Sequence, residues 1–94
     1  MKQFYLDPKA FLGGVVYSDE KQDVVHLSLL AGNEVPLYES EFTINLFVIE
    51  GKVQLRLSNE TVLLAARDLI VLPPKLQHEM LIKEDAQILV TKIK

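Results

Sequence analysis

The chain has no cysteine and no tryptophan, and it has only four glycines and four prolines among its 94 residues. Without cysteine there can be no disulfide, no thiolate metal ligand and no cysteine nucleophile. Basic residues are also few, because ten lysines and arginines stand against thirteen acidic residues, which gives a formal charge of −3. The lysines and arginines form no cluster in the sequence that could bind along the phosphate backbone of a nucleic acid. The composition therefore excludes thiol chemistry and argues against a nucleic-acid partner.

Long apolar runs are missing as well. The longest are a handful of residues, whereas a membrane-spanning helix needs about 20. The N-terminal stretch MKQFYLDPKAF has no long apolar core typical of a signal peptide. We therefore expect a cytoplasmic protein with no membrane partner.

What the chain does have is an apolar fraction of 49% and a positive mean hydropathy of +0.18. A single small domain over residues 1–94 is expected, and such a domain buries only roughly 60–65% of its unfolded surface. Some apolar surface would then be covered by a second copy, so we expect a homodimer. The segment Lys2 to Leu6, with Phe4 beside Tyr5, could add a strand to the partner's sheet.

Apolar and polar residues alternate with period two along most of the chain, and no amphipathic helix is evident. Tight turns are predicted at residues 50–52, around Gly51, and at residues 58–60, while one helical turn could begin at Asp7. Pro73 ends a strand because proline cannot donate to the ladder. The predicted strands are Val24–Leu30, Glu41–Glu50, Val53–Leu57, Thr61–Ala65, Asp68–Leu72, His78–Ile82 and Gln87–Ile93. Many short strands joined by turns predict an all-β sandwich or barrel.

The segment from Gly32 to Gly51 has a regular spacing. Five residues separate Gly32 from Tyr38, and Ser40 follows with one residue between. Three residues then lead to Ile44, and six more lead to Gly51. The first motif of the cupin family has the same frame, with His-x-His at the positions of Tyr38 and Ser40 and Glu at the position of Ile44.

A second stretch fits the second cupin motif, with Arg67 in place of its glycine and Ile82 in place of its asparagine. Pro73 and His78 match that motif in both spacing and identity. The chain therefore resembles a small single-domain cupin, over about residues 24–90. The resemblance implies an all-β fold, the double-stranded β-helix or cupin-type jelly-roll barrel.

Cupins hold a divalent metal with three histidines and one carboxylate. At those positions this chain has Tyr38, Ser40, Ile44 and His78, so only one ligand is retained. A phenol and a hydroxyl are poor ligands for metals that prefer imidazole and carboxylate. Glutamates next to these positions face the other way because successive side chains alternate. We therefore expect no metal and no other cofactor, with His78 as the one candidate ligand.

The same frame predicts which side chains line the barrel. They are Tyr38, Ser40, Ile44, His78, Met80 and Ile82. Tyr38 is expected to face His78 across the barrel, whereas His26 lies on a strand whose inner side cannot be assigned. One hypothesis is a metal-free protein that binds a small apolar or aromatic molecule, or serves only as a dimeric module.

The alternative is a small isomerase or lyase. Its acid and base would be His78 and Tyr38, the two candidate catalytic residues. A third hypothesis is the sensing half of a regulatory system, in which another protein would contact DNA.

Overall fold

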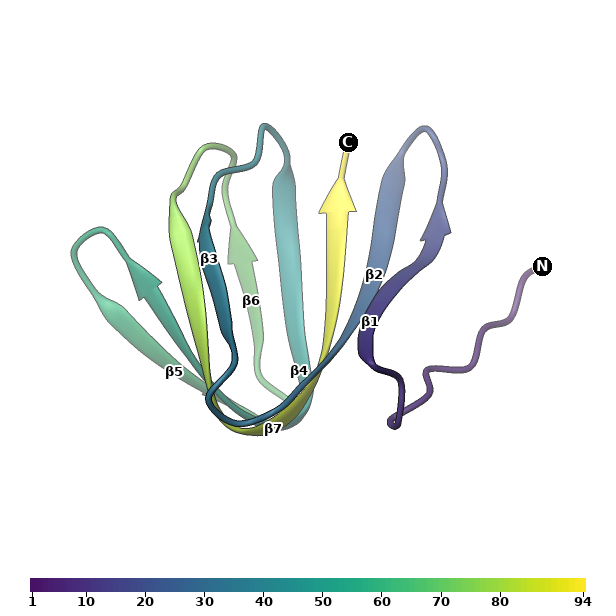
Figure 1. Ribbon diagram of the computed structural model, residues 1–94. Helices are drawn as coiled ribbons and strands as arrows, with labels where there is room; N and C mark the ends of the chain where they lie inside the picture. Colours follow the sequence, from purple (N-terminus) through teal and green to yellow (C-terminus); the bar gives the residue numbers. More distant parts are fainter.

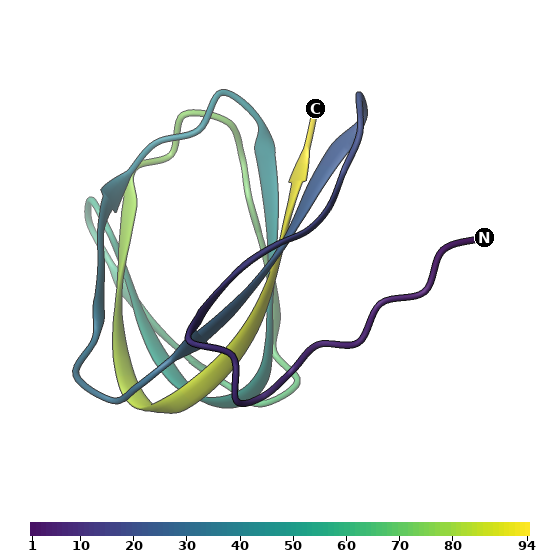
Figure 2. The same ribbon diagram turned by 45° about the vertical axis from the view of Figure 1, so that its right-hand side comes forward.

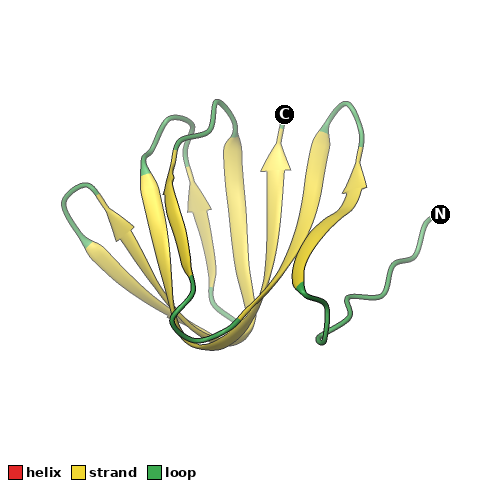
Figure 3. Ribbon diagram, in the orientation of Figure 1, coloured by secondary structure: helices red, strands yellow, loops and turns green.

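The computed structural model describes the backbone of residues 1–94 and every side chain except that of Leu37. Along this backbone there are seven strands, and Figure 3 shows only strands and loops. No helix of the described chain is therefore long and apolar enough to cross a membrane. The strands are β1 Leu12–Ser18, β2 Gln22–Leu29, β3 Glu34–Tyr38, β4 Thr43–Leu57, β5 Thr61–Ala65, β6 Leu69–Leu72 and β7 His78–Ile93.

The strands form two walls that share the long strands β4 and β7, and every pairing is antiparallel. The large wall contains β1, β2, residues 86–93 of β7, residues 43–48 of β4, and β6. The small wall contains β3, residues 78–84 of β7, residues 52–57 of β4, and β5. Figures 1 and 2 show both long strands turning at the closed lower end, from which the walls rise on either side.

β4 bends at Gly51, which has a φ of +94° that L side chains rarely adopt. A Cβ at this position would overlap the backbone of Asp85 at the bend of β7. The residues of β4 that face inward have even numbers before the bend and odd numbers after it, so that Val48 and Val53 both point into the core. The predicted tight turn at residues 50–52 is therefore wrong. β7 pairs with β4 on both sides of Gly51, so the chain passes through a bulge and continues as one strand.

The other long strand, β7, is continuous, although the alternation pattern predicted two separate strands, His78–Ile82 and Gln87–Ile93. Two strands, β1 and β3, were not among those predicted from the sequence. The expected helical turn at Asp7 is a single tight turn instead, in which the backbone N–H of Ala10 donates to the Asp7 carbonyl over 3.1 Å.

The remaining strand predictions are confirmed. β2 and β6 overlap the predicted strands at residues 24–30 and 68–72, and β5 has the predicted bounds. The turn at residues 58–60 closes with the backbone N–H of Leu57 donating to the Glu60 carbonyl over 2.8 Å. Turn residues and two-residue alternation were therefore sufficient to predict these strands and this turn from the sequence.

The core lies between the walls and is made of the inward side chains of both long strands and their neighbours. It consists of Leu29, Ile44, Leu46, Val48, Val53, Leu55, Leu64, Leu72, Met80, Ile82, Ala86 and Ile88. Because these residues come from five of the seven strands and from both walls, burying them requires both walls to be in place.

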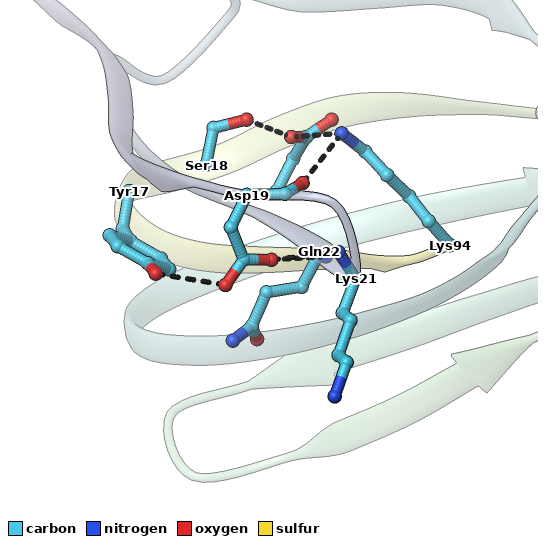
Figure 4. A network of polar contacts seen from close by, with 7 residues as sticks. Tyr17, Ser18, Asp19, Lys21, Gln22 and Lys94 are labelled. Carbon is cyan, nitrogen blue, oxygen red and sulfur yellow. Dashed lines mark hydrogen bonds and ion pairs between the residues drawn. The ribbon is translucent and has the colours of Figure 1, made fainter.

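The turn between β1 and β2 is built around Asp19 (Figure 4). Its carboxylate accepts the backbone N–H groups of Lys21 and Gln22 over 2.8 and 2.9 Å, and the Tyr17 hydroxyl over 2.8 Å. The backbone N–H of Lys21 is the largest of the causes that lower the pKa of Asp19. The carboxylate therefore stabilises the turn in its ionised form.

The C-terminus is tied to the same turn. The ammonium group of Lys94 lies 2.9 Å from the carboxylate of Asp23 and donates to the Asp19 carbonyl over 3.1 Å. The Ser18 hydroxyl also donates to Asp23, and this contact is the largest cause that lowers the pKa of that carboxyl group. The last residues of β7 are thereby fixed at the open end of the large wall.

His26, whose side could not be assigned, lies on the outer side of the large wall and is 4% exposed. Its Nε2 donates to the side-chain oxygen of Gln87 over 2.7 Å. The amide nitrogen of Gln87 in turn donates to the Pro8 carbonyl over 3.1 Å. His26 is therefore a structural residue that attaches the N-terminal segment to the wall.

Candidate functional site

A cavity of about 240 Å³ lies between the walls, near the open end of the barrel. Its lining includes Tyr38 at the end of β3, Ile44 near the start of β4, and His78 and Lys92 near the two ends of β7. These strand ends lie at the top of Figure 1, on the two walls. The lining residues are mostly apolar. They are Val25, Leu27, Val35, Tyr38, Ile44, Leu46, His78, Met80, Val90 and Lys92.

Four of the six predicted lining residues meet in this cavity: Tyr38, Ile44, His78 and Met80. The other two do not line it. Ile82 is 1% exposed and belongs to the packed core below the cavity. Ser40 is buried, and its hydroxyl oxygen accepts the backbone N–H of Phe42 over 3.0 Å. Because β3 ends at Tyr38, the two-residue alternation does not continue to Ser40.

Tyr38 and His78 contact each other, but they do so as neighbours on one wall. They are register partners on β3 and β7. Their ring centroids are 5.6 Å apart, and the ring planes are at 84°, an edge-to-face arrangement. The expectation that Tyr38 faces His78 across the barrel is wrong, because β3 pairs directly with the first half of β7.

The imidazole of His78 is 6% exposed and already makes one hydrogen bond. Its Nδ1 lies 3.1 Å from the Leu76 carbonyl oxygen. Because a carbonyl oxygen only accepts, Nδ1 carries the hydrogen in this contact. Among the described side chains, none forms a hydrogen bond with Nε2 of His78. The ring is thus held in one orientation by Nδ1, and Nε2 is available to form a hydrogen bond with a bound molecule.

Six of the lining residues were not among those predicted, and Lys92 is the one polar residue among the six. It lies near the end of β7, and its ammonium group is 6.0 Å from the centre of the Tyr38 ring. A signal for it was present, since Lys92 has the same two-residue phase as the inward residues Ile88 and Val90. The resemblance to cupins covered the chain only to residue 90, so this position was not considered.

The positions that would hold a metal in cupins do not form a donor set here. Ile44 is an aliphatic core residue, and the hydroxyl of Ser40 is engaged with the backbone. That leaves the neutral phenol of Tyr38 beside a single imidazole, that of His78. Within the described side chains, no three histidine, cysteine, aspartate or glutamate residues gather in a way that could hold a metal ion. The residues present do not fit a transition metal.

No family model matches the sequence, and no curated protein matches it. The fold is similar to several solved structures. A cupin from Methanocaldococcus jannaschii, described as RmlC-like with a double-stranded β-helix fold, superposes with a TM-score of 0.85 at 18% identity, over 97% of this chain and 86% of that one. An RmlC-like cupin from Desulfovibrio desulfuricans gives 0.80 at 22% identity, over 99% and 91%.

A third similar structure is a conserved protein of unknown function from Streptococcus pyogenes. Its TM-score is 0.82 at 22% identity, over 88% of this chain and 73% of that one. The chain therefore has the cupin fold, a double-stranded β-helix, as the two motif frames predict. Identities this low carry over the fold and no activity.

Proposed function

We propose that this protein is a metal-free, cupin-type binding protein that holds a small apolar or aromatic molecule in the cavity between its walls. The observation that best supports this is the composition of the cavity. Seven of its ten lining side chains are apolar, and the polar groups are confined to Tyr38, His78 and Lys92. Apolar walls with a few placed polar groups are typical of small-molecule sites.

The size of the cavity limits the ligand. A volume of about 240 Å³ corresponds to about eight water molecules at ~30 Å³ each. This is space for one small ring or a short branched chain. A larger hollow of about 290 Å³ lies on the outer side of the small wall, but the ion pair of Arg56 with Glu79 forms part of its lining. The inner cavity is the better site for an apolar molecule.

A second candidate function is the isomerase or lyase with Tyr38 and His78 as acid and base. The contact between the two rings favours it, because both groups border the same cavity. The edge-to-face contact by itself is equally compatible with simple packing of the two rings. In the described structure no hydrogen bond joins the two side chains, so the contact alone does not establish an acid–base pair. Turnover of a bound compound would decide between the two functions.

We further propose that the protein acts as a homodimer in the cytoplasm, the location expected from its sequence. The outer side of the large wall supports the dimer. Leu69 and Val71 of β6 are 62% and 57% exposed there, and Phe47 and Leu89 lie beside them in register. A face made of uncharged side chains can pair with its own copy without opposing like charges.

The binding function can be tested by nuclear magnetic resonance with methyl-labelled methionine. The chain has two methionines, and Met80 lines the cavity, so its methyl signal reports directly on a bound molecule. A library of small aromatic and branched aliphatic compounds should contain some that shift this signal. Val90→Phe, which fills the cavity, should abolish the shift. The control variant Leu63→Phe, on the exposed outer face of the small wall, should leave it unchanged.

The outcomes separate the candidate functions. If no compound moves the Met80 signal, or if Val90→Phe leaves binding intact, the cavity is not a binding site. If a bound compound is converted, and both Tyr38→Phe and His78→Gln stop the conversion without preventing binding, the enzyme replaces the binding protein as the better description.

A further inference from the structure

One strongly basic side chain lines the cavity, that of Lys92. Lys92 is half-buried and follows Val90 on the inner side of β7. No aspartate or glutamate is among the residues that line the cavity. The charge of this region therefore differs in sign from the net charge of the chain, which is −3.

The acidic residue next to Lys92 on the large wall is Asp23, its register partner on β2. That carboxylate is already engaged, because it lies 2.9 Å from the ammonium group of Lys94 and accepts the Ser18 hydroxyl. Among the described side chains, Lys92 forms no ion pair within 4.0 Å. The close contact of Asp23 is thus with Lys94, whereas Lys92 acts on that carboxylate only through a weaker, longer-range attraction, the last of the causes that lower the pKa of Asp23.

The ammonium group of Lys92 is oriented toward the cavity side of the wall. It lies over the ring of Tyr38, 6.0 Å from its centre, a cation–π contact. The same ring contacts His78, whose Nδ1 is held by the Leu76 carbonyl. Tyr38, His78 and Lys92 therefore form one polar rim around the entrance to an apolar space.

We infer that the cavity selects the anion of a small acid with an aromatic or branched apolar body. The carboxylate binds the ammonium group of Lys92 at the rim, and the body packs against Val25, Leu27 and Val90. A charge-assisted hydrogen bond is stronger than a neutral one, and it is least screened where apolar walls exclude water. This assignment of ligand class rests on the proposed binding function and names Lys92 as its specificity determinant.

The experiment uses three probes of similar shape and different charge: benzoate, benzamide and benzylamine. Dissociation constants are measured at neutral pH from the Met80 methyl signal, on the full chain and on Lys92→Met. The matched control is Lys83→Met, which removes an exposed lysine at the bend of the same strand, away from the cavity. Circular dichroism and thermal unfolding confirm that each variant is folded.

Benzoate should bind at least about tenfold tighter than benzamide, and benzylamine should bind more weakly than either, as expected for one charge-assisted hydrogen bond. Lys92→Met should remove the preference for benzoate, while Lys83→Met keeps it. Equal affinities for benzoate and benzamide, or a preference that survives Lys92→Met, would overturn the assignment of the ligand class and leave the binding function standing. No binding of any probe would overturn both.

Discussion

Gly51 of β4 lies directly against the carbonyl oxygen of Asp85 of β7, at the point where both long strands bend. The two bends must coincide because the strands pair on both sides of this point. Gly51 allows this in two ways, through its positive φ of +94° and through the space that its missing Cβ leaves. The contact sets the angle at which the walls rise around the cavity.

Gly51→Ala should therefore be strongly destabilising. The matched control is Gly32→Ala, because Gly32 has a similar φ of +90° but open space around a new Cβ. The control should lose about 1–2 kcal/mol of unfolding free energy, the cost of the backbone conformation alone. Gly51→Ala should lose about 3 kcal/mol or more, since backbone atoms must also move. Denaturant unfolding measures both, and equal losses would show that the close approach is not important.

The dimer can be tested by sedimentation at tens of micromolar. Leu69→Glu places a charge on the outer side of the large wall and should weaken association at least about tenfold, or by about 1.4 kcal/mol. Leu63→Glu is the control, since Leu63 is 72% exposed on β5 of the small wall. A monomeric protein, or equal effects of the two variants, would contradict the proposed interface.

The N-terminal segment gives a separate prediction. It forms no strand in this structure. The ring of Phe4 packs against that of Tyr17 of the same chain, with 5.9 Å between the ring centroids, while Tyr5 is 83% exposed. If the segment pairs with the partner's sheet, as the sequence suggested, deletion of residues 1–6 should weaken the dimer. An unchanged association constant would restrict the role of Phe4 to packing within one chain.

Purified protein should contain no stoichiometric transition metal. The prediction rests on three substituted ligand positions, with Ile44 unable to donate and Ser40 turned to its own backbone. Elemental analysis of protein prepared without chelator measures this, after incubation with Zn²⁺, Ni²⁺, Mn²⁺ or Fe²⁺. Close to one metal ion per chain, lost in His78→Ala, would contradict it.

The unfolding free energy should fall when the pH drops below about 4. Asp19 and Asp23 have a pKa below the ordinary value of 3.8 in the folded chain, chiefly through hydrogen bonds from Lys21 and Ser18 respectively. Their contribution is fully present above 3.8 and is lost as the pH falls through the lower folded values, because the unfolded chain then binds more protons.

Asp19→Asn and Asp23→Asn should therefore flatten the acid limb of a plot of unfolding free energy against pH. Glu20→Gln, in the same turn, serves as the control. An acid limb that is unchanged in both aspartate variants would show that these carboxylates do not couple folding to protonation.

The sequence by itself determined the fold class, the position of most strands and the inward side of Ile44, His78 and Met80. These features depend on two-residue alternation and turn residues, which act over a few neighbouring positions. Motif spacing added the type of barrel, because it fixes how many residues lie between points that must meet in space.

Only the tertiary structure decided which residues surround the cavity. Alternation gives the side on which a residue lies, but the neighbouring strand is set by pairing between distant segments. A glycine at a bulge has the same local signal as a glycine in a hairpin, so the course of β4 through Gly51 depended on β7. For the same reason, Tyr38 came to lie beside His78, and Lys92 joined them from the far end of the chain.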